Sequence, residues 1–200
     1  MKKITHTCIS AIKLRDGRIM MAGDRRCSWG WGFAAECPEP KVIKKNGFLL
    51  GGTGDSDFLE LILDAFEPDQ EGELKTYLHF KFKRDVAKFL KQQGYRDEHD
   101  LLRLPAEADC EILLAKENKL FVVTFRPGEL ERPLPEPSII SIGEVKPPFA
   151  VGCGAASALP ILLAKLKEVS YNTKEHLRLA MQTAADISPG CDGRVDFISE

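Results

Sequence analysis

Two pairs of amphipathic helices separate three groups of strand-forming segments along this 200-residue chain. In the strand-forming segments, β-branched and aromatic residues predominate, and the segments end at Gly, Asn or Asp turns typical of antiparallel hairpins. In the other segments, apolar residues recur every three or four positions, the period of a helix that packs on one face. Strands grouped by short turns, with helices in pairs, predict stacked sheets covered by helices on the outside.

The expected strands cover 7–14, 19–23, 41–44, 48–51, 110–115, 120–125, 149–152 and 194–198, with a short strand at 138–141. The expected helices run from about 55 to 66 and from 74 to 93, then around 158–166 and 173–185. Asp55 or Ser56 is the candidate N-cap of the first helix, and Asn172 or Thr173 that of the last. Gly94 is a natural stop for the second. The Gly- and Pro-containing segments 27–40 and 126–148 are interpreted as loop and as irregular or edge structure.

Charge and cysteine spacing exclude several classes of function. The net charge of −2 and the pI near 6.1 give no reason to expect a nucleic acid or an anionic membrane as partner. The six cysteines are far apart and form no CxxC, so neither a zinc ribbon nor a redox motif of that type is indicated, and no metal or organic cofactor is expected. No apolar run approaches the ~20 residues of a membrane span. We therefore expect one cytoplasmic domain over residues 1–200 with reduced thiols.

Six short segments, spread along the chain, together resemble the motifs of a known family. They are TCISAI (7–12), MMAGDRR (20–26), KVI (41–43), LGGTGD (50–55), VGCG (151–154) and AADI (184–187). In order and nearly in spacing they resemble the proteasome β-subunit family, which includes the bacterial HslV-type peptidase. The resemblance covers almost the whole chain. It implies an α+β fold, a four-layer αββα sandwich of the N-terminal-nucleophile hydrolase type.

The chemistry of such hydrolases explains the residue types. The first residue of the mature chain attacks an amide with its side chain, and its own α-amino group takes the proton. The reference pKa of that amino group, about 7.7 to 8.0, suits a base near neutral pH. A neighbouring ammonium lowers it further, and a carboxylate can hold that ammonium in place. A main-chain N–H at a Gly turn can stabilise the oxyanion.

Carried over by position, the resemblance implies six site residues. They are Thr7 as nucleophile, Asp24 as acidic partner, Lys41 as the nearby lysine, Gly51 as oxyanion N–H donor, Cys153 where the family usually has Ser, and Asp186 as the second acidic residue. The residues alone also fit structural roles. Thr is common in strands, Lys is usually solvated, and Cys is often a small buried hydrophobe.

The start of the chain departs from the family pattern. Residues 1–6 precede Thr7 and are a candidate short propeptide, whose removal requires cleavage at the His6–Thr7 bond. A one-residue shift of the register would place Cys8 at the nucleophile position, where a thiolate can do the same chemistry. A thiol at Cys153 is a weaker hydrogen-bond partner than the usual hydroxyl.

Three functions follow from the resemblance. The first is a threonine-type endopeptidase subunit that assembles into a homo-oligomeric ring and cleaves unfolded polypeptide, with an AAA+ unfoldase as a candidate partner. The second is a catalytically silent subunit that uses the same sandwich for assembly. The third is an amidohydrolase acting on small amides. A mature N-terminus at Thr7 distinguishes an active subunit from a silent one.

Overall fold

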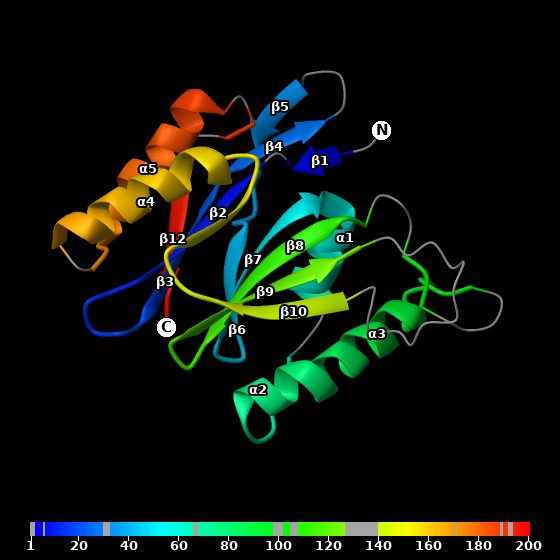
Figure 1. Ribbon diagram of the computed structural model, residues 1–200. Coiled ribbons are helices and arrows are strands. Elements are labelled where there is room, and N and C mark those ends of the chain that lie inside the picture. Colours follow the sequence, from blue (N-terminus) through cyan, green and yellow to red (C-terminus); the bar gives the residue numbers. More distant parts are fainter. Residues whose placement is uncertain are drawn as a thin grey trace.

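The computed structural model describes residues 3–5, 7–29, 33–65, 68–97, 102–104, 108–126, 140–169, 171–188, 190–191 and 194–200 (Figure 1). Its strands are β1 (Lys3–Thr5), β2 (Cys8–Lys13), β3 (Ile19–Asp24), β4 (Arg26–Trp29), β5 (Phe33–Glu36), β6 (Val42–Lys45), β7 (Phe48–Asp55), β8 (Cys110–Lys116), β9 (Lys119–Phe125), β10 (Ile140–Val145), β11 (Phe149–Gly152) and β12 (Val195–Ser199). Its helices are α1 (Ser56–Glu60), α2 (Leu74–Thr76), α3 (Lys83–Gln92), α4 (Ala155–Val169) and α5 (Lys174–Ile187), with π-helical turns η1 (Leu61–Ala65) and η2 (Tyr77–Phe82).

The strands form two antiparallel sheets. The larger has the order β10-β9-β8-β7-β1-β4-β5, with β6 also paired to β7, and the smaller has the order β11-β2-β3-β12. Helices α4 and α5 pack on the outer face of the smaller sheet, and the helical segment from α1 to α3 covers the outer face of the larger one (Figure 1). The arrangement is the expected four-layer αββα sandwich.

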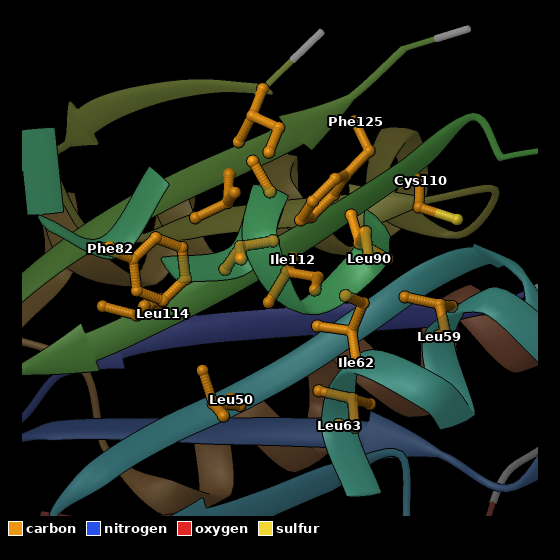
Figure 2. Packing of buried hydrophobic residues seen from close by; sticks show 14 of the residues in the cluster. Leu50, Leu59, Ile62, Leu63, Phe82, Leu90, Cys110, Ile112, Leu114 and Phe125 are labelled. Atoms are coloured by element: carbon orange, nitrogen blue, oxygen red, sulfur yellow. The ribbon is translucent and has the colours of Figure 1, made fainter. Parts of the chain in front are cut away.

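The two-residue period of the strands builds three apolar layers. In β8, Ile112 and Leu114 point to the helices, where they pack with Leu90 and Phe82 (Figure 2). Leu113, between them in sequence, belongs instead to the layer between the two sheets. Because neighbouring side chains point to opposite faces of a sheet, a strand covered on both sides is apolar throughout.

Local signals at the helix ends are confirmed. The Asp55 side chain accepts a hydrogen bond from Phe58 N at 3.0 Å, and the Thr173 hydroxyl accepts one from His176 N at 3.3 Å. Gly94 follows α3 with φ of +93°, the left-handed conformation of a helix stop. The described part of the chain has no helix long and apolar enough to cross a bilayer.

Three expectations needed correction. The predicted loop 27–40 contains most of the hairpin β4–β5, because pairing in the large sheet overrides the local Gly and Pro signals. The expected strand at 138–141 lies further along as β10, with residues 138 and 139 outside the described part. Cys37 is disulfide-bonded, although reduced thiols were expected, because spacing in sequence does not report which cysteines the fold brings together.

Candidate active site

Thr7 lies where the chain passes from one sheet to the other. Thr5 in β1 pairs with Gly54 in the larger sheet, whereas Cys8 in β2 pairs with Gly152 in the smaller one. Thr7 itself is fully buried. The pairing of β1 and β2 in different sheets therefore fixes Thr7 at one end of the space between the two sheets.

The hydroxyl of Thr7 contacts a buried ion pair. Lys41 Nζ donates to Thr7 Oγ1 at 2.7 Å and to Asp24 Oδ1 at 3.1 Å, and it also donates to the main-chain carbonyl of Arg26. Asp24 ends β3, and Lys41 directly precedes β6. Because these two segments lie beside Thr7, Lys41 reaches the Thr7 hydroxyl from 34 positions away, and Asp24 reaches Lys41 from 17 positions away.

Burial and pairing act in opposite directions on this lysine. Burial lowers the pKa of Lys41, and the neighbouring Asp24 carboxylate opposes that lowering. Asp24 is fixed in turn, because it accepts main-chain hydrogen bonds from Cys8 N at 2.9 Å and Arg26 N at 3.3 Å. The arrangement presents a held ammonium to the Thr7 hydroxyl, which is the environment that favours an ionised or attacking oxygen.

Glycines and a thiol surround the carbonyl of Thr7. Gly152 has φ of +90°, and a Cβ there would overlap the Thr7 carbonyl oxygen. Cys153 Sγ donates to that oxygen at 3.5 Å, and Gly154 N donates to it at 3.5 Å. The VGCG segment thus allows a close approach of main chain that a larger residue would prevent.

A cleft of about 560 Å³ adjoins this side of Thr7. Its lining includes Thr53, Glu111, Thr124, Arg126 and Gly152. Thr53, Glu111 and Thr124 are paired with one another across β7, β8 and β9. They lie on the face of the large sheet that, further along the same strands, forms the apolar layer between the two sheets. The inter-sheet core therefore ends in a polar cleft beside Thr7.

The six expected site residues are not all brought together. Thr7, Asp24 and Lys41 form one hydrogen-bonded group, and Cys153 contacts Thr7 from the other side. Gly51 lies in β7 opposite Val42, with room for no side chain between Val42 and Ile9.

Asp186, one of the six, and Cys8, the alternative nucleophile, lie elsewhere. Asp186 is exposed on α5, where its Oδ1 accepts a hydrogen bond from Gln182 at 2.9 Å, so it is not part of the group around Thr7. The side chain of Cys8 points away from Lys41 into the layer under α4 and α5, while its N–H binds Asp24. The register with Thr7 as the nucleophile is thus the one that places a side-chain oxygen on Lys41.

Sequence reasoning missed two features of the site. Strand β1 was not predicted, and Cys191, which lies 3.6 Å from Cys153 between the two sulfur atoms, was not assigned a place. Glu111 carried a usable signal, because it is a charged residue at an inward position of an otherwise apolar strand. Strand β1 was not predicted because its three residues are too few to show a two-residue period.

The fold is that of proteasome-like structures of the N-terminal-nucleophile type. The BPH protein of Thiobacillus denitrificans in complex with epoxomicin superposes with a TM-score of 0.71 at 20% identity, covering 96% of this chain and 97% of that one. Eukaryotic HslV from Trypanosoma brucei gives 0.58 at 16% identity, covering 96% and 98%. Anbu, an ancestral β-subunit from Yersinia bercovieri, gives 0.57 at 14% identity, covering 96% and 80%.

No protein-family model and no curated protein sequence matches the chain. The likeness to the solved structures is therefore one of fold, spread over nearly the full length.

Proposed function

We propose that this chain is a proteasome-like threonine peptidase subunit that becomes active when it is cleaved between His6 and Thr7. The observation that carries the proposal is the contact of 2.7 Å between Lys41 Nζ and Thr7 Oγ1, with Asp24 holding the lysine. Lys41 is already paired with Asp24, and its further contact with the Thr7 hydroxyl is what a nucleophile needs.

Peptide cleavage would proceed through an ester. Thr7 Oγ1 attacks the scissile carbonyl, the freed amino group of Thr7 takes the hydroxyl proton, and the same proton goes to the departing amine. Water then hydrolyses the Thr7 ester and releases the acid. The Lys41 ammonium stabilises the developing charge on Oγ1, and the Gly51 N–H is the proposed oxyanion donor.

Strand β1 supports the maturation step. Residues Lys3–Thr5 lie between β4 and β7, with Ile4 opposite both Ser28 and Asp55. An extended segment in that position leads directly to the His6–Thr7 bond. Removing residues 1–6 would leave two strand edges open, and an extended substrate can pair with such edges through its main chain. We infer that the acyl part of a substrate takes the place of β1.

The cleft next to Gly152 is the proposed site for a substrate side chain. Two carboxylates, Asp109 and Glu111, and one guanidinium, Arg126, line it, and no ion pair joins them within the described residues. The excess of negative charge favours a basic side chain. Unfolded polypeptide, delivered by an AAA+ unfoldase, is the expected substrate.

The decisive experiment compares three purified chains. The full-length chain should be inert, because the amide nitrogen between His6 and Thr7 is not basic. A chain released from a removable fusion so that it begins at Thr7 should hydrolyse fluorogenic peptides and gain the mass of a β-lactone inhibitor. The same trimmed chain with Thr7→Ala should do neither. Inert trimmed protein that keeps its fold would overturn the proposal.

A matched pair of lysine variants tests the assigned group. Lys41→Ala in the trimmed chain should lower kcat by at least 100-fold. Lys44→Ala, on the exposed side of the neighbouring strand β6, should leave kcat unchanged. Equal activity of the two variants would show that the Lys41 contact has no role in the chemistry.

The second candidate is a catalytically silent subunit, and one observation favours it. With β1 built into the large sheet, the Thr7 nitrogen remains an amide and the proposed substrate position is filled by the chain itself. Intact mass after prolonged incubation separates the two candidates. A chain that keeps Met1–His6 under all conditions while assembling normally is the silent form.

Assembly into a ring is proposed for either candidate. Leu163 on α4 and Leu179 and Ile187 on α5 are exposed apolar side chains on the outer helices. Light scattering should give a mass several times 22.3 kDa. Leu179→Glu should reduce that mass, whereas Gln182→Glu on the same helix should not. A stable monomer at micromolar concentration would exclude a ring.

A further inference from the structure

Three cysteine side chains, none of them in a disulfide, gather around Gly154 next to Thr7. Cys153 Sγ lies 3.6 Å from Cys191 Sγ and 3.5 Å from the Thr7 carbonyl oxygen. A Cβ at Gly154 would be 2.7 Å from Cys191 Sγ and 3.0 Å from Cys8 Sγ. Because Gly154 has no side chain, these sulfur atoms share one small space at the start of α4.

The two members of the close pair differ in access. Cys153 is exposed, whereas Cys191 is 3% exposed. The hydrogen bond with Cys153 raises the pKa of Cys191, and burial raises it further. Cys191 therefore keeps its proton near neutral pH, and Cys153 is the sulfur that meets a dissolved oxidant first.

We propose that Cys153 and Cys191 are a reversible disulfide pair that switches the reactivity of Thr7. A disulfide bond is about 2.05 Å long, so the sulfur atoms must approach by roughly 1.5 Å. The turn Cys153–Gly154 and the glycine at 190 next to Cys191 lie outside helices and strands, where a shift of this size is least opposed.

The oxidation is balanced with hydrogen peroxide as oxidant. The Cys153 sulfur attacks one peroxide oxygen, which gives a sulfenic acid and one water. The Cys191 thiol then displaces the hydroxyl of that sulfenic acid, forming the S–S bond and a second water. A dithiol reductant reverses the reaction by two thiol–disulfide exchanges and is itself oxidised to a cyclic disulfide.

The switch acts through a hydrogen bond. In the reduced chain the Cys153 thiol donates to the Thr7 carbonyl, and a disulfide has no S–H to donate. The bond to Cys191 also draws the sulfur away from that carbonyl. Thr7 then loses one of the contacts that orient it toward Lys41. This consequence for catalysis rests on the proposed function, whereas the disulfide itself does not.

The covalent step is tested by peptide mapping of the full-length chain without reduction. After treatment with a small excess of hydrogen peroxide, a peptide joining Cys153 to Cys191 should appear, and dithiothreitol should remove it. Cys191→Ala should abolish it. Cys110→Ala, which removes a buried free thiol on the far face of the large sheet, should leave it unchanged. Oxidation of Cys153 that stops at sulfinic acid would overturn the pairing.

The link to Thr7 is tested without catalysis as well. Thr7–Cys8 is the single Thr-Cys sequence in the chain, so labelling Thr carbonyls with carbon-13 and Cys nitrogens with nitrogen-15 selects one peptide group for NMR. Its resonance should move on oxidation, return on reduction, and stay in place in Cys191→Ala.

In the trimmed chain, oxidation should slow β-lactone labelling of Thr7 at least tenfold, and Cys191→Ala should label at the reduced rate in both conditions. Labelling that is equally fast in both redox states, with the disulfide present, would exclude the switch. Absence of labelling in both states would instead refute the proposed peptidase, while the NMR result still decides the link to Thr7.

Discussion

The two sides of Thr7 are built on different principles. On the hydroxyl side, a buried ammonium and a buried carboxylate are joined to each other and to main-chain groups by short hydrogen bonds. On the carbonyl side, two glycines give room for a close main-chain approach, and the Cys153 thiol supplies a weak, long contact. Charged hydrogen bonds are roughly twice as strong as neutral ones, and thiols are weaker still.

This difference suggests that the hydroxyl side is rigid and the carbonyl side is adjustable. The hydroxyl side fixes one arrangement, because a buried charge that loses its partner is costly. The carbonyl side can change its contacts at little cost, provided that the main chain stays where it is. The following predictions separate the rigid parts of each side from the adjustable ones.

The largest effect is expected for Gly152→Ala. The new Cβ would overlap the Thr7 carbonyl oxygen at a φ of +90°, so strain and a main-chain clash act together. We expect a loss of more than about 4 kcal/mol in the free energy of unfolding, or failure to fold. Urea denaturation measures it.

Gly94→Ala is the matched control for Gly152→Ala. Its φ is +93° but nothing lies within 4 Å of the added Cβ. Strain alone should cost about 1 to 3 kcal/mol there. Equal losses in the two variants would show that the close approach to Thr7 is unimportant.

Asp24→Ala should cost about 3 to 5 kcal/mol, because it leaves the Lys41 ammonium buried without its carboxylate. Adding Lys41→Met to this variant should restore part of the lost free energy of unfolding, because the unpaired ammonium is then removed. Asp196→Ala breaks the more exposed pair with Arg25 and should cost no more than about 1 kcal/mol. If the double variant is no more stable than Asp24→Ala, the pair does not act as a unit.

Cys8 joins the two sides, and its thiol predicts a pH dependence. Burial raises the pKa of Cys8 from 9.0 to about 12. Below pH 9 the thiol is protonated in both the folded and the unfolded chain. Above pH 9 the unfolded chain ionises first, so stability falls by about 1.4 kcal/mol per pH unit, or about 2 kcal/mol by pH 10.5.

The measurement is thermal or urea unfolding between pH 8 and pH 10.5 in the presence of reductant. Cys8→Ala should flatten the decline, and Cys110→Ala should flatten it by a similar amount, because burial also raises the pKa of Cys110 to about 12. An unchanged slope in Cys8→Ala would show that its thiol is solvated.

The same contrast explains what could be predicted from the sequence. Strands, helices and caps follow from periodicity and from single residues such as Thr173, so the four layers were accessible. Thr7, Asp24 and Lys41 sit in segments with strong local patterns, and the resemblance placed them together. Asp186 lies apart from that group, because a short motif at a helix end does not report which side of the helix faces the site.

The carbonyl side was less predictable for a physical reason. Contacts between Cys153 and Cys191 depend on how a turn and a loop meet in space, and no period or motif encodes that meeting. The place of β1 in the large sheet depends on pairing with residues 24 or more positions away. Long-range register is decided by the whole sheet rather than by three residues.

The smallest effect is expected at Thr53, on the cleft side of Gly152. Its side chain is 8% exposed, its hydroxyl makes no hydrogen bond to the described residues, and it points toward Gly152. Thr53→Val keeps the shape and removes only that hydroxyl, so stability should stay within about 0.5 kcal/mol of the native value. The same substitution at Thr7 removes an acceptor from the buried Lys41 ammonium and should cost about 1.5 to 3 kcal/mol. Parallel urea titrations compare the two threonines directly. A loss at Thr53 as large as that at Thr7 would mean that the cleft side is as tightly specified as the side that holds Lys41.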